Sequence, residues 1–411
     1  MTGRDGIKGK NRRGMAVLGG AVGAFAAAAA MATGSAVTAA PAKADFEDLL
    51  DPIIQPLMTS LTDSLAGFDP TAAADLTSWT DSFLSSLNAL DVTAALPSAA
   101  EPAASTTISG TGDIPITMQE GTEPTVLVSV DGSTPEATLV DTGSSGLLVP
   151  INDLSLTQLF DLGFPTGINS VSFSGGIDAF YLEYNDAMVG YGDGALTTTN
   201  TPLDVEFFSF PTSFSAGSPL DFQQFLTDDA SPGGILGIGS SGETGPGIGP
   251  FEAAGVSGVT VDLNPAGGEL VVGSNAGTPI EPALNGAATP LNNLTETVTN
   301  SSGTVIGSGS VSDDVDSGGV YGTIPSTIAS NVAQGDTISV YDGNTLLYQY
   351  LVGTDSFGTN EAPTVTTGTA GATNAIDSGV EPFLKEPIFI SYGGTNADGA
   401  ITFDEPFLQT S

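Results

Sequence analysis

The chain has 411 residues, of which 47 are acidic and 7 basic, and it contains neither cysteine nor histidine. These absences exclude disulfides, thiolate chemistry, histidine-dependent nucleophilic catalysis and histidine-ligated zinc. Because every basic residue except Lys385 precedes residue 45, the rest of the chain repels nucleic acid and anionic lipid. Acid–base chemistry must therefore come from carboxylates, tyrosine or the few lysines.

The first 44 residues have the pattern of a secretory signal peptide. A basic stretch over residues 8–13 precedes an alanine-rich apolar segment, and Ala42-Lys43-Ala44 forms a small-residue cleavage site. We expect residues 1–44 to direct secretion, or export to the cell envelope, by the general, twin-arginine or type VII route. A permanent membrane anchor is the alternative, which the abundant alanine and the cleavage site disfavour.

Residues 45–96 are expected to form a helical hairpin. Apolar residues recur there at helical spacing in two stripes, which Gly67-Phe-Asp69-Pro70 separates. The stripes could bind an unidentified partner protein, although packing on each other or on the main domain is the expected use. Residues 97–112, rich in alanine, proline and serine, are the expected linker.

From residue 113 onward, short apolar runs between glycine-rich turns predict β structure. One run leads into Asp141-Thr142-Gly143-Ser144, and the pattern returns 175 residues later as Asp316-Ser317-Gly318. In both copies a proline stands nine residues after the aspartate, at Pro150 and Pro325. The repeat predicts two similarly built lobes, residues 113–270 and 271–411, with a cleft between them.

Two carboxylates held side by side share one proton, because both cannot ionise together. The charged carboxylate can activate water as a general base while the protonated one hydrogen-bonds a substrate carbonyl, with the pair titrating as a unit at acidic pH. We therefore predict Asp141 and Asp316 as a catalytic dyad that uses no cofactor and no metal. A third Asp-Thr/Ser-Gly triplet, Asp377-Ser-Gly379, lacks the apolar run and proline that follow the other two and is expected to be a turn or strand edge.

These motifs resemble those of the pepsin-like aspartic proteases, and within them the mycobacterial PE-family (PecA-like) aspartic protease domain. Besides the two aspartate turns, Gly233–Gly237 looks like the apolar segment that this family threads behind its first aspartate. The resemblance covers roughly residues 113–408. It implies a mainly β, bilobal fold, here preceded by the helical hairpin.

The resemblance also implies roles for the neighbours of the dyad. Thr142 and Ser317 would hydrogen-bond across the lobes, and Ser144 would bond the outer oxygen of Asp141. Gly143 and Gly318 would let the two backbones approach closely. A flap tyrosine would close over the cleft; Tyr184 is the candidate, with Tyr181 and Tyr191 as rivals.

Two departures from the family pattern concern the second turn. Gly319 stands where a serine or threonine often supports the second aspartate, and losing such a partner should raise the proton affinity of Asp316. The second apolar segment is not clear either, with Phe383–Phe389 as the nearest candidate.

Three functions fit these features. The first is a secreted aspartic endopeptidase that hydrolyses exported or cell-envelope proteins. The second is an inactive protein of the same fold that binds a peptide or glycan at the surface, and the third is a structural surface protein. The presence of both aspartates favours the first, whereas the third leaves the paired turns unexplained.

Overall fold

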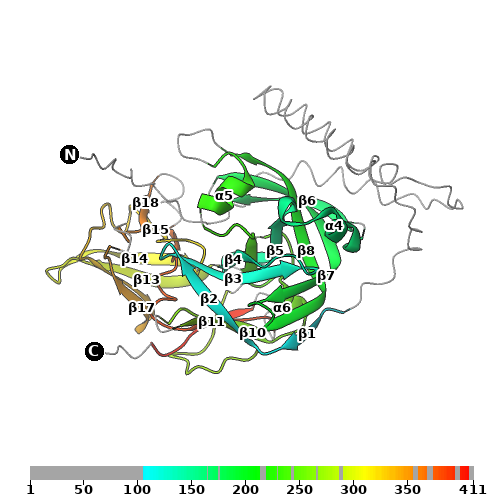
Figure 1. Ribbon diagram of the computed structural model, residues 1–411. Coiled ribbons are helices and arrows are strands. Elements are labelled where there is room, and N and C mark those ends of the chain that lie inside the picture. Colours follow the sequence, from blue (N-terminus) through cyan, green and yellow to red (C-terminus); the bar gives the residue numbers. More distant parts are fainter. Residues whose placement is uncertain are drawn as a thin grey trace, which may run out of the picture. The chain divides into compact units, whose positions relative to one another are not determined.

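Figure 1 shows the computed structural model of the chain, which describes residues 105–406 except 164, 175, 213–218, 229, 242–244, 265–266, 287–289, 355–359, 368–373 and 394–398. The predicted signal peptide and helical hairpin lie outside the described residues. The described part is mainly β, as the glycine-rich alternating sequence predicted. Within it, no helix is both long and apolar enough to cross a membrane.

The larger sheet has 14 strands, in the order β12-β21-β20-β10-β11-β2-β3-β4-β9-β5-β8-β7-β6, with β1 paired to β8. Its strands are β1 (Thr107–Gly110), β2 (Asp113–Gln119), β3 (Glu123–Val130), β4 (Glu136–Asp141), β5 (Ser145–Pro150), β6 (Gly167–Phe173), β7 (Ile177–Tyr191), β8 (Leu196–Pro211), β9 (Ile235–Ile238), β10 (Gly258–Asp262), β11 (Gly268–Val272), β12 (Leu284–Asn285), β20 (Ile388–Ser391) and β21 (Ala400–Phe403).

The smaller sheet has seven strands, in the order β17-β16-β13-β14-β19-β15-β18 (Figure 1, yellow and orange). They are β13 (Leu291–Thr299), β14 (Val305–Asp314), β15 (Thr323–Pro325), β16 (Thr337–Asp342), β17 (Thr345–Leu351), β18 (Thr364–Thr366) and β19 (Ala375–Asp377). Each sheet delivers one of the two aspartate turns.

The two halves of the sequence are not separate in space. Strands β20 and β21 come from the end of the chain, yet β20 pairs with β10 and so joins the larger sheet. The predicted boundary between residues 270 and 271 falls inside β11. The division into lobes at that point stays a prediction, and the chain beyond it contributes strands to both sheets.

Short helices lie in the segments that connect successive strands. Helix α4 (Leu156–Asp161) begins at Ser155, whose side chain accepts a hydrogen bond from Gln158 in a capping box. Helix α5 (Phe222–Asp228) packs against β7 and β8, and α6 (Pro250–Ala253) begins with proline in its first turn. A 3-10 turn, η2 (Ile151–Asp153), follows β5.

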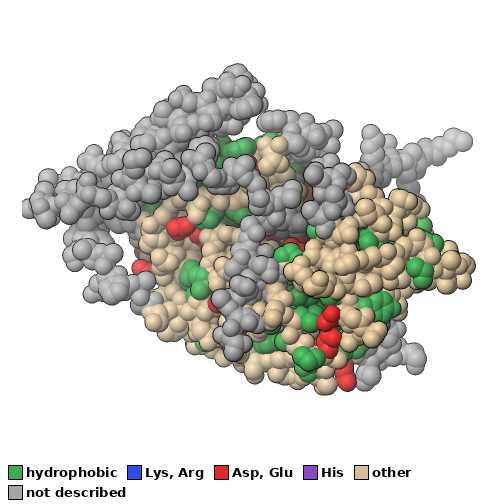
Figure 2. Space-filling model, turned by 180° about the vertical axis from the view of Figure 1, so that it is seen from behind, with side chains coloured by type: hydrophobic (Ala, Val, Ile, Leu, Met, Phe, Trp, Pro, Cys, Tyr) green, Lys and Arg blue, Asp and Glu red, His purple; other side chains and the backbone are tan. Residues whose placement is uncertain are grey.

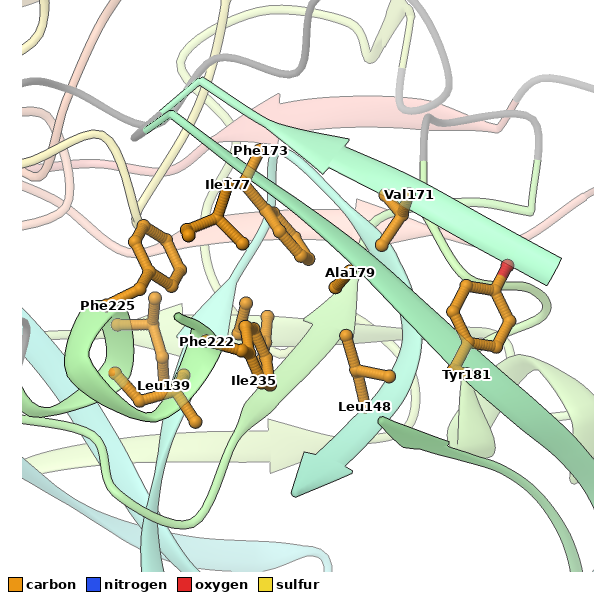
Figure 3. Packing of buried hydrophobic residues seen from close by; sticks show 11 residues of the cluster. Leu139, Leu148, Val171, Phe173, Ile177, Ala179, Tyr181, Phe222, Phe225 and Ile235 are labelled. Atoms are coloured by element: carbon orange, nitrogen blue, oxygen red, sulfur yellow. The ribbon is translucent and has the colours of Figure 1, made fainter. Parts of the chain in front are cut away.

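An aromatic cluster lies next to the strand that leads to Asp141 (Figure 3). Phe173 at the end of β6 stacks on Phe222 and Phe225 of α5, with ring centroids 5.8 and 5.6 Å away. Leu139, two residues before Asp141, belongs to the same buried cluster. Burial of these large side chains fixes β4 against the hairpin β6–β7 and so positions the first aspartate turn.

Acidic side chains are scattered over the face in Figure 2, among mostly uncharged ones. The single cation beyond residue 44, Lys385, pairs with Glu381 at 3.4 Å. Most acidic groups therefore have no cationic partner, and those that are buried are best accommodated in the neutral form.

Candidate active site

The two aspartate turns are joined by four reciprocal hydrogen bonds. The Thr142 hydroxyl donates to the carbonyl of Val315 at 2.6 Å, and the Ser317 hydroxyl donates to the carbonyl of Val140 at 2.7 Å. In return, the backbone N–H of Thr142 donates to Ser317 Oγ at 3.1 Å, and that of Ser317 donates to Thr142 Oγ1 at 2.8 Å. These are the cross-lobe contacts that the resemblance implied for Thr142 and Ser317.

We predict that Ser317→Ala destabilises the fold. The substitution leaves a buried carbonyl and a buried N–H without partners, and each loss costs about 1–3 kcal/mol. Urea unfolding should report a lower free energy of unfolding. Thr107→Val is the matched control, since its hydroxyl makes a solvent-exposed hydrogen bond with Thr199, and it should cost little. Equal losses in the two variants would contradict this prediction.

Glycine at positions 143 and 318 makes the close approach of the two turns feasible. A Cβ on Gly143 would lie 2.5 Å from Cγ of Asp316, and one on Gly318 would lie 3.1 Å from Oδ1 of Asp141. The first distance is shorter than real Cβ contacts. The absence of a side chain at each glycine therefore leaves room for the aspartate of the opposite turn, and this allows the two carboxyl groups to come together.

Asp141 and Asp316 are 2% and 1% exposed, respectively. Asp141 accepts hydrogen bonds from Gly143 N at 2.9 Å and from Ser144 Oγ at 2.6 Å, the latter as the resemblance implied. Asp316 accepts one from Gly318 N at 2.8 Å, while its Oδ2 is buried with no partner in the described chain. The negative charge is therefore better stabilised on Asp141 than on Asp316.

The pKa values follow from this asymmetry. Burial raises the pKa of Asp141, while hydrogen bonds from Asp316 and Ser144 oppose the rise. Burial, followed by the charge of Asp141, raises the pKa of Asp316 well above its ordinary value. Since the pKa of Asp316 is raised by both burial and the charge of Asp141, a single proton on the pair is favoured on Asp316.

We predict that Ser144→Ala shifts the acidic limb of the pH–rate profile to higher pH. The Ser144 hydroxyl favours the charged form of Asp141, so its loss raises the pKa of Asp141 further. Peptide hydrolysis followed from pH 2 to 8 would show the shift. Ser308→Ala, on the exposed part of β14, should leave the profile in place, and an unmoved limb in Ser144→Ala would refute the assignment.

Strand β9, which contains most of Gly233–Gly237, lies beside β4 and behind Asp141, as the resemblance implied for this segment. It runs parallel to β4, with Gly237 opposite Asp141. A Cβ on Gly237 would come within 2.8 Å of Ser144 Oγ, so glycine is needed there for Ser144 to reach the carboxylate.

In the second half of the site this place belongs to β19, not to the segment Phe383–Phe389. Strand β19 runs parallel to β14 and ends at Asp377, while the end of the predicted segment enters β20 of the larger sheet. Asp377 does end a strand, as expected, but the strand runs behind Asp316. The Ser378 hydroxyl accepts a hydrogen bond from Asp316 N at 3.1 Å. The prediction for Phe383–Phe389 was wrong because the strand behind Asp316 ends at the polar sequence Asp377-Ser378-Gly379, where an apolar-apolar-Gly sequence was expected.

The structure places Tyr184 in the middle of β7, opposite Leu203, where it is 5% exposed. Burial raises its pKa to about 12. Tyr181 and Tyr191 are buried in the same strand, and Tyr181 donates to the carbonyl of Pro246 at 3.1 Å. Tyr181 and Tyr184 lie away from the turns, so a flap role for Tyr184 has no support in this geometry. Tyr191 ends β7, and its carbonyl accepts a hydrogen bond from Gly194 N in the β7–β8 turn, but its side chain is fully buried. The aromatic residue bordering the β6–β7 turn is Phe173, whose side chain is buried in the aromatic cluster.

No group of three or more acidic side chains suited to a metal ion occurs in the described ranges. What the site does offer is a buried pair of carboxyls that share a proton, held by two crossed turns. This arrangement defines an aspartyl peptidase-like protein.

The comparisons agree with that class. The family model for the PE-PGRS C-terminal aspartyl peptidase-like domain matches residues 112–400, and the chain belongs to this family. PE cleavage protein A from Mycobacterium tuberculosis, strains CDC 1551 and H37Rv, is 32% identical over 312 residues, which cover 71% of this chain and 52% of the relative. The Mycobacterium marinum protein of the same name is 32% identical over 311 residues.

The chain therefore spans about half the length of the curated relatives it matches, 52% of each. Among solved structures, the aspartic proteinase from Irpex lacteus is similar at 16% identity and a TM-score of 0.48. That match covers 72% of this chain and 97% of the other.

Proposed function

We propose that the chain is a secreted aspartic endopeptidase whose Asp141–Asp316 dyad activates water to hydrolyse peptide bonds. The observation that carries this proposal is the set of four reciprocal hydrogen bonds between the turns, which brings two buried carboxyls into contact. Family membership supports the same activity.

In the proposed reaction Asp141 is the general base and Asp316 the general acid. Asp141 takes a proton from water as the water oxygen attacks the substrate carbonyl carbon, and Asp316 donates its proton to the carbonyl oxygen. The resulting tetrahedral diol collapses when the C–N bond breaks: the amine nitrogen takes the proton held by Asp141, and one diol hydroxyl returns its proton to Asp316, which restores the starting pair. Thr142, Ser317, Gly143 and Gly318 hold the carboxyls together, while Ser144 stabilises the charge on Asp141.

Exported or cell-envelope proteins are the proposed substrates. The relatives carry the name PE cleavage protein A, so an exported protein with a PE segment is the first substrate to offer. Export of this chain by the signal peptide of residues 1–44 belongs to the same proposal. The helical hairpin of residues 45–96 would then travel with the protease and either pack on it or bind a partner.

The test is cleavage of a peptide library by the full chain from pH 3 to 7. A protein bearing a PE segment serves as a second substrate, and Asp186→Asn, on the exposed side of β7, is a control that should keep full activity. Cleavage at acidic pH would support the proposal. Peptides that bind and are recovered uncut throughout this range would favour the inactive binding protein instead.

A further inference from the structure

The second aspartate turn lacks a side-chain donor that the first turn has. Ser144 stands three residues after Asp141 and donates to its outer oxygen at 2.6 Å. The matching position after Asp316 is Gly319, and Oδ2 of Asp316 is buried without a hydrogen-bond partner in the described chain. A buried carboxyl oxygen without a partner is costly, so a donor is expected nearby.

Asp377 stands in β19 where Ile235 stands in β9. Ile235 lies opposite Leu139 in a parallel ladder and opposite Leu148 in an antiparallel one. Asp377 has the same two relations, with Asp314 and Thr323. Each pair is offset equally from its own aspartate, by two residues before and seven after. A carboxyl group therefore replaces a buried isoleucine directly behind the second catalytic turn.

The side chain of Asp377 fills the space that Gly319 leaves open. A Cβ on Gly319 would lie 2.8 Å from Cγ of Asp377 and 2.9 Å from its Oδ2, closer than real Cβ contacts. The backbone at Gly319 does not have the positive φ that favours glycine, so a side chain is excluded there by Asp377 alone. The aspartate at 377 therefore requires a glycine at 319, because its carboxyl group occupies the space of a side chain at that position.

The hydrogen bonds of Asp377 leave one oxygen open. Its Oδ1 accepts from Gly379 N at 2.9 Å, and its Oδ2 is buried without a partner in the described chain, like Oδ2 of Asp316. A charge on Asp377 raises the pKa of Asp316, so the two carboxylates repel each other when both are ionised, whereas a protonated carboxyl is a donor. One proton on Asp377 Oδ2 satisfies both open oxygens.

We propose that the protonated carboxyl of Asp377 donates a hydrogen bond to Oδ2 of Asp316, and is the positioning residue that replaces the missing serine at 319. The inference rests on the proposed function, because it concerns the residue that holds the general acid in place. Asp377 acts through the catalytic aspartate, by way of its charge or its proton, and has no role toward the substrate in this inference.

The surroundings favour a neutral Asp377. Burial raises its pKa well above the ordinary value, and the charge of Asp314 adds to the rise. The other titratable groups that act on Asp377 or Asp316 are Asp141 of β4, Asp313 of β14 and Tyr350 of β17. All of them are acids, so no cation is present among them to hold Asp377 in the charged form.

The test replaces the Gly319–Asp377 pair of the second turn with the serine–isoleucine pair that the first turn has at Ser144 and Ile235. In the full chain, Asp377→Ile removes the donor and should lower kcat about 10- to 100-fold with little change in KM, the range for leaving a buried acceptor without its donor. Adding Gly319→Ser should restore kcat, because the serine takes the role of Ser144 while isoleucine matches Ile235. Adding Gly319→Ala fills the same space without a hydroxyl and should not restore it. Asp377→Asn keeps a donor and should retain more activity than Asp377→Ile.

Carbon-13 NMR of aspartate-labelled protein gives a readout that needs no activity. With the Asp316 signal assigned by its loss in Asp316→Asn, the pKa of Asp316 should rise in Asp377→Ile and return when Gly319→Ser is added. A lower or unchanged pKa in Asp377→Ile, or equal rescue by alanine and serine, would overturn the inference. A wild-type chain that cleaves nothing would reject the proposed function, while the titration would still decide whether Asp377 donates to Asp316.

Discussion

Asp141→Asn and Asp316→Asn are each expected to lower kcat for peptide hydrolysis by about 10²- to 10⁴-fold, the contribution of a positioned acid or base. Asparagine has the shape of aspartate and can neither take nor give the proton that the pair shares. The double variant should be no slower than either single variant, because the two carboxyls act as one unit. Steady-state kinetics on one library-derived peptide would measure all three losses.

Folding must be checked beside these rates, since both aspartates are buried. Each asparagine amide replaces a buried carboxyl whose pKa is raised with a group that does not ionise, so thermal unfolding should show stability equal to or above that of the wild type at neutral pH. A folded Asp316→Asn variant that retains activity within tenfold of the wild type would remove Asp316 from the dyad.

The protein is expected to lose stability as the pH rises from 4 to 8. Burial raises the pKa of Asp204 and Glu296 to about 8, and that of Glu206 and Asp314 to about 7. Over this range the folded protein keeps protons that the unfolded chain has released, so the free energy of unfolding falls with rising pH. Each such group contributes roughly 1 kcal/mol per pH unit until the pH passes its folded pKa. Urea unfolding at half-unit steps would measure the slope.

Glu296→Gln tests the source of that slope. Glu296 is 2% exposed on β13, and Oε2 of its side chain has no partner in the described chain, so the neutral amide should flatten the pH dependence. Asp186→Asn, on the exposed side of β7, should leave the slope unchanged. Stability that increases from pH 4 to 8 would contradict the assignment, since it would mean that the buried carboxylates are stabilised in the charged form.

The first half of the site could be predicted from the sequence because local chemistry determines it. The apolar run before Asp141 forms β4, and Gly143 and Ser144 have roles that depend on residues within the turn or on its repeated partner. The roles of Thr142 and Ser317 came from the resemblance to the pepsin-like aspartic proteases, and the hydrogen bonds between the two turns agree with them. The mainly β fold likewise follows from strand-length apolar runs between glycines.

The second half could not be predicted, because its chemistry depends on pairing across the sheet. In the sequence alone, Asp377 has the pattern of an isolated turn. Its position behind Asp316 depends on the pairing of β19 with β14, which the structure provides. The number of residues between Asp141 and Tyr184 suggested Tyr184 as the flap tyrosine. The bounds of β6 and β7 instead place Tyr184 in mid-strand and Phe173 at the β6–β7 turn. Likewise, nothing local to β20 indicates that it crosses to the larger sheet and pairs with β10.

Active-site titration tests the central claim most directly. A peptide whose scissile bond is replaced by a hydroxyl-bearing tetrahedral isostere mimics the diol that Asp141 and Asp316 stabilise. Added to the full chain at its optimal pH, it should abolish cleavage linearly with an end point of one inhibitor per chain, and both Asp→Asn variants should bind it far more weakly. An isostere that binds no better than the parent peptide, or equally well to the wild type and both variants, would contradict a proton-sharing catalytic dyad.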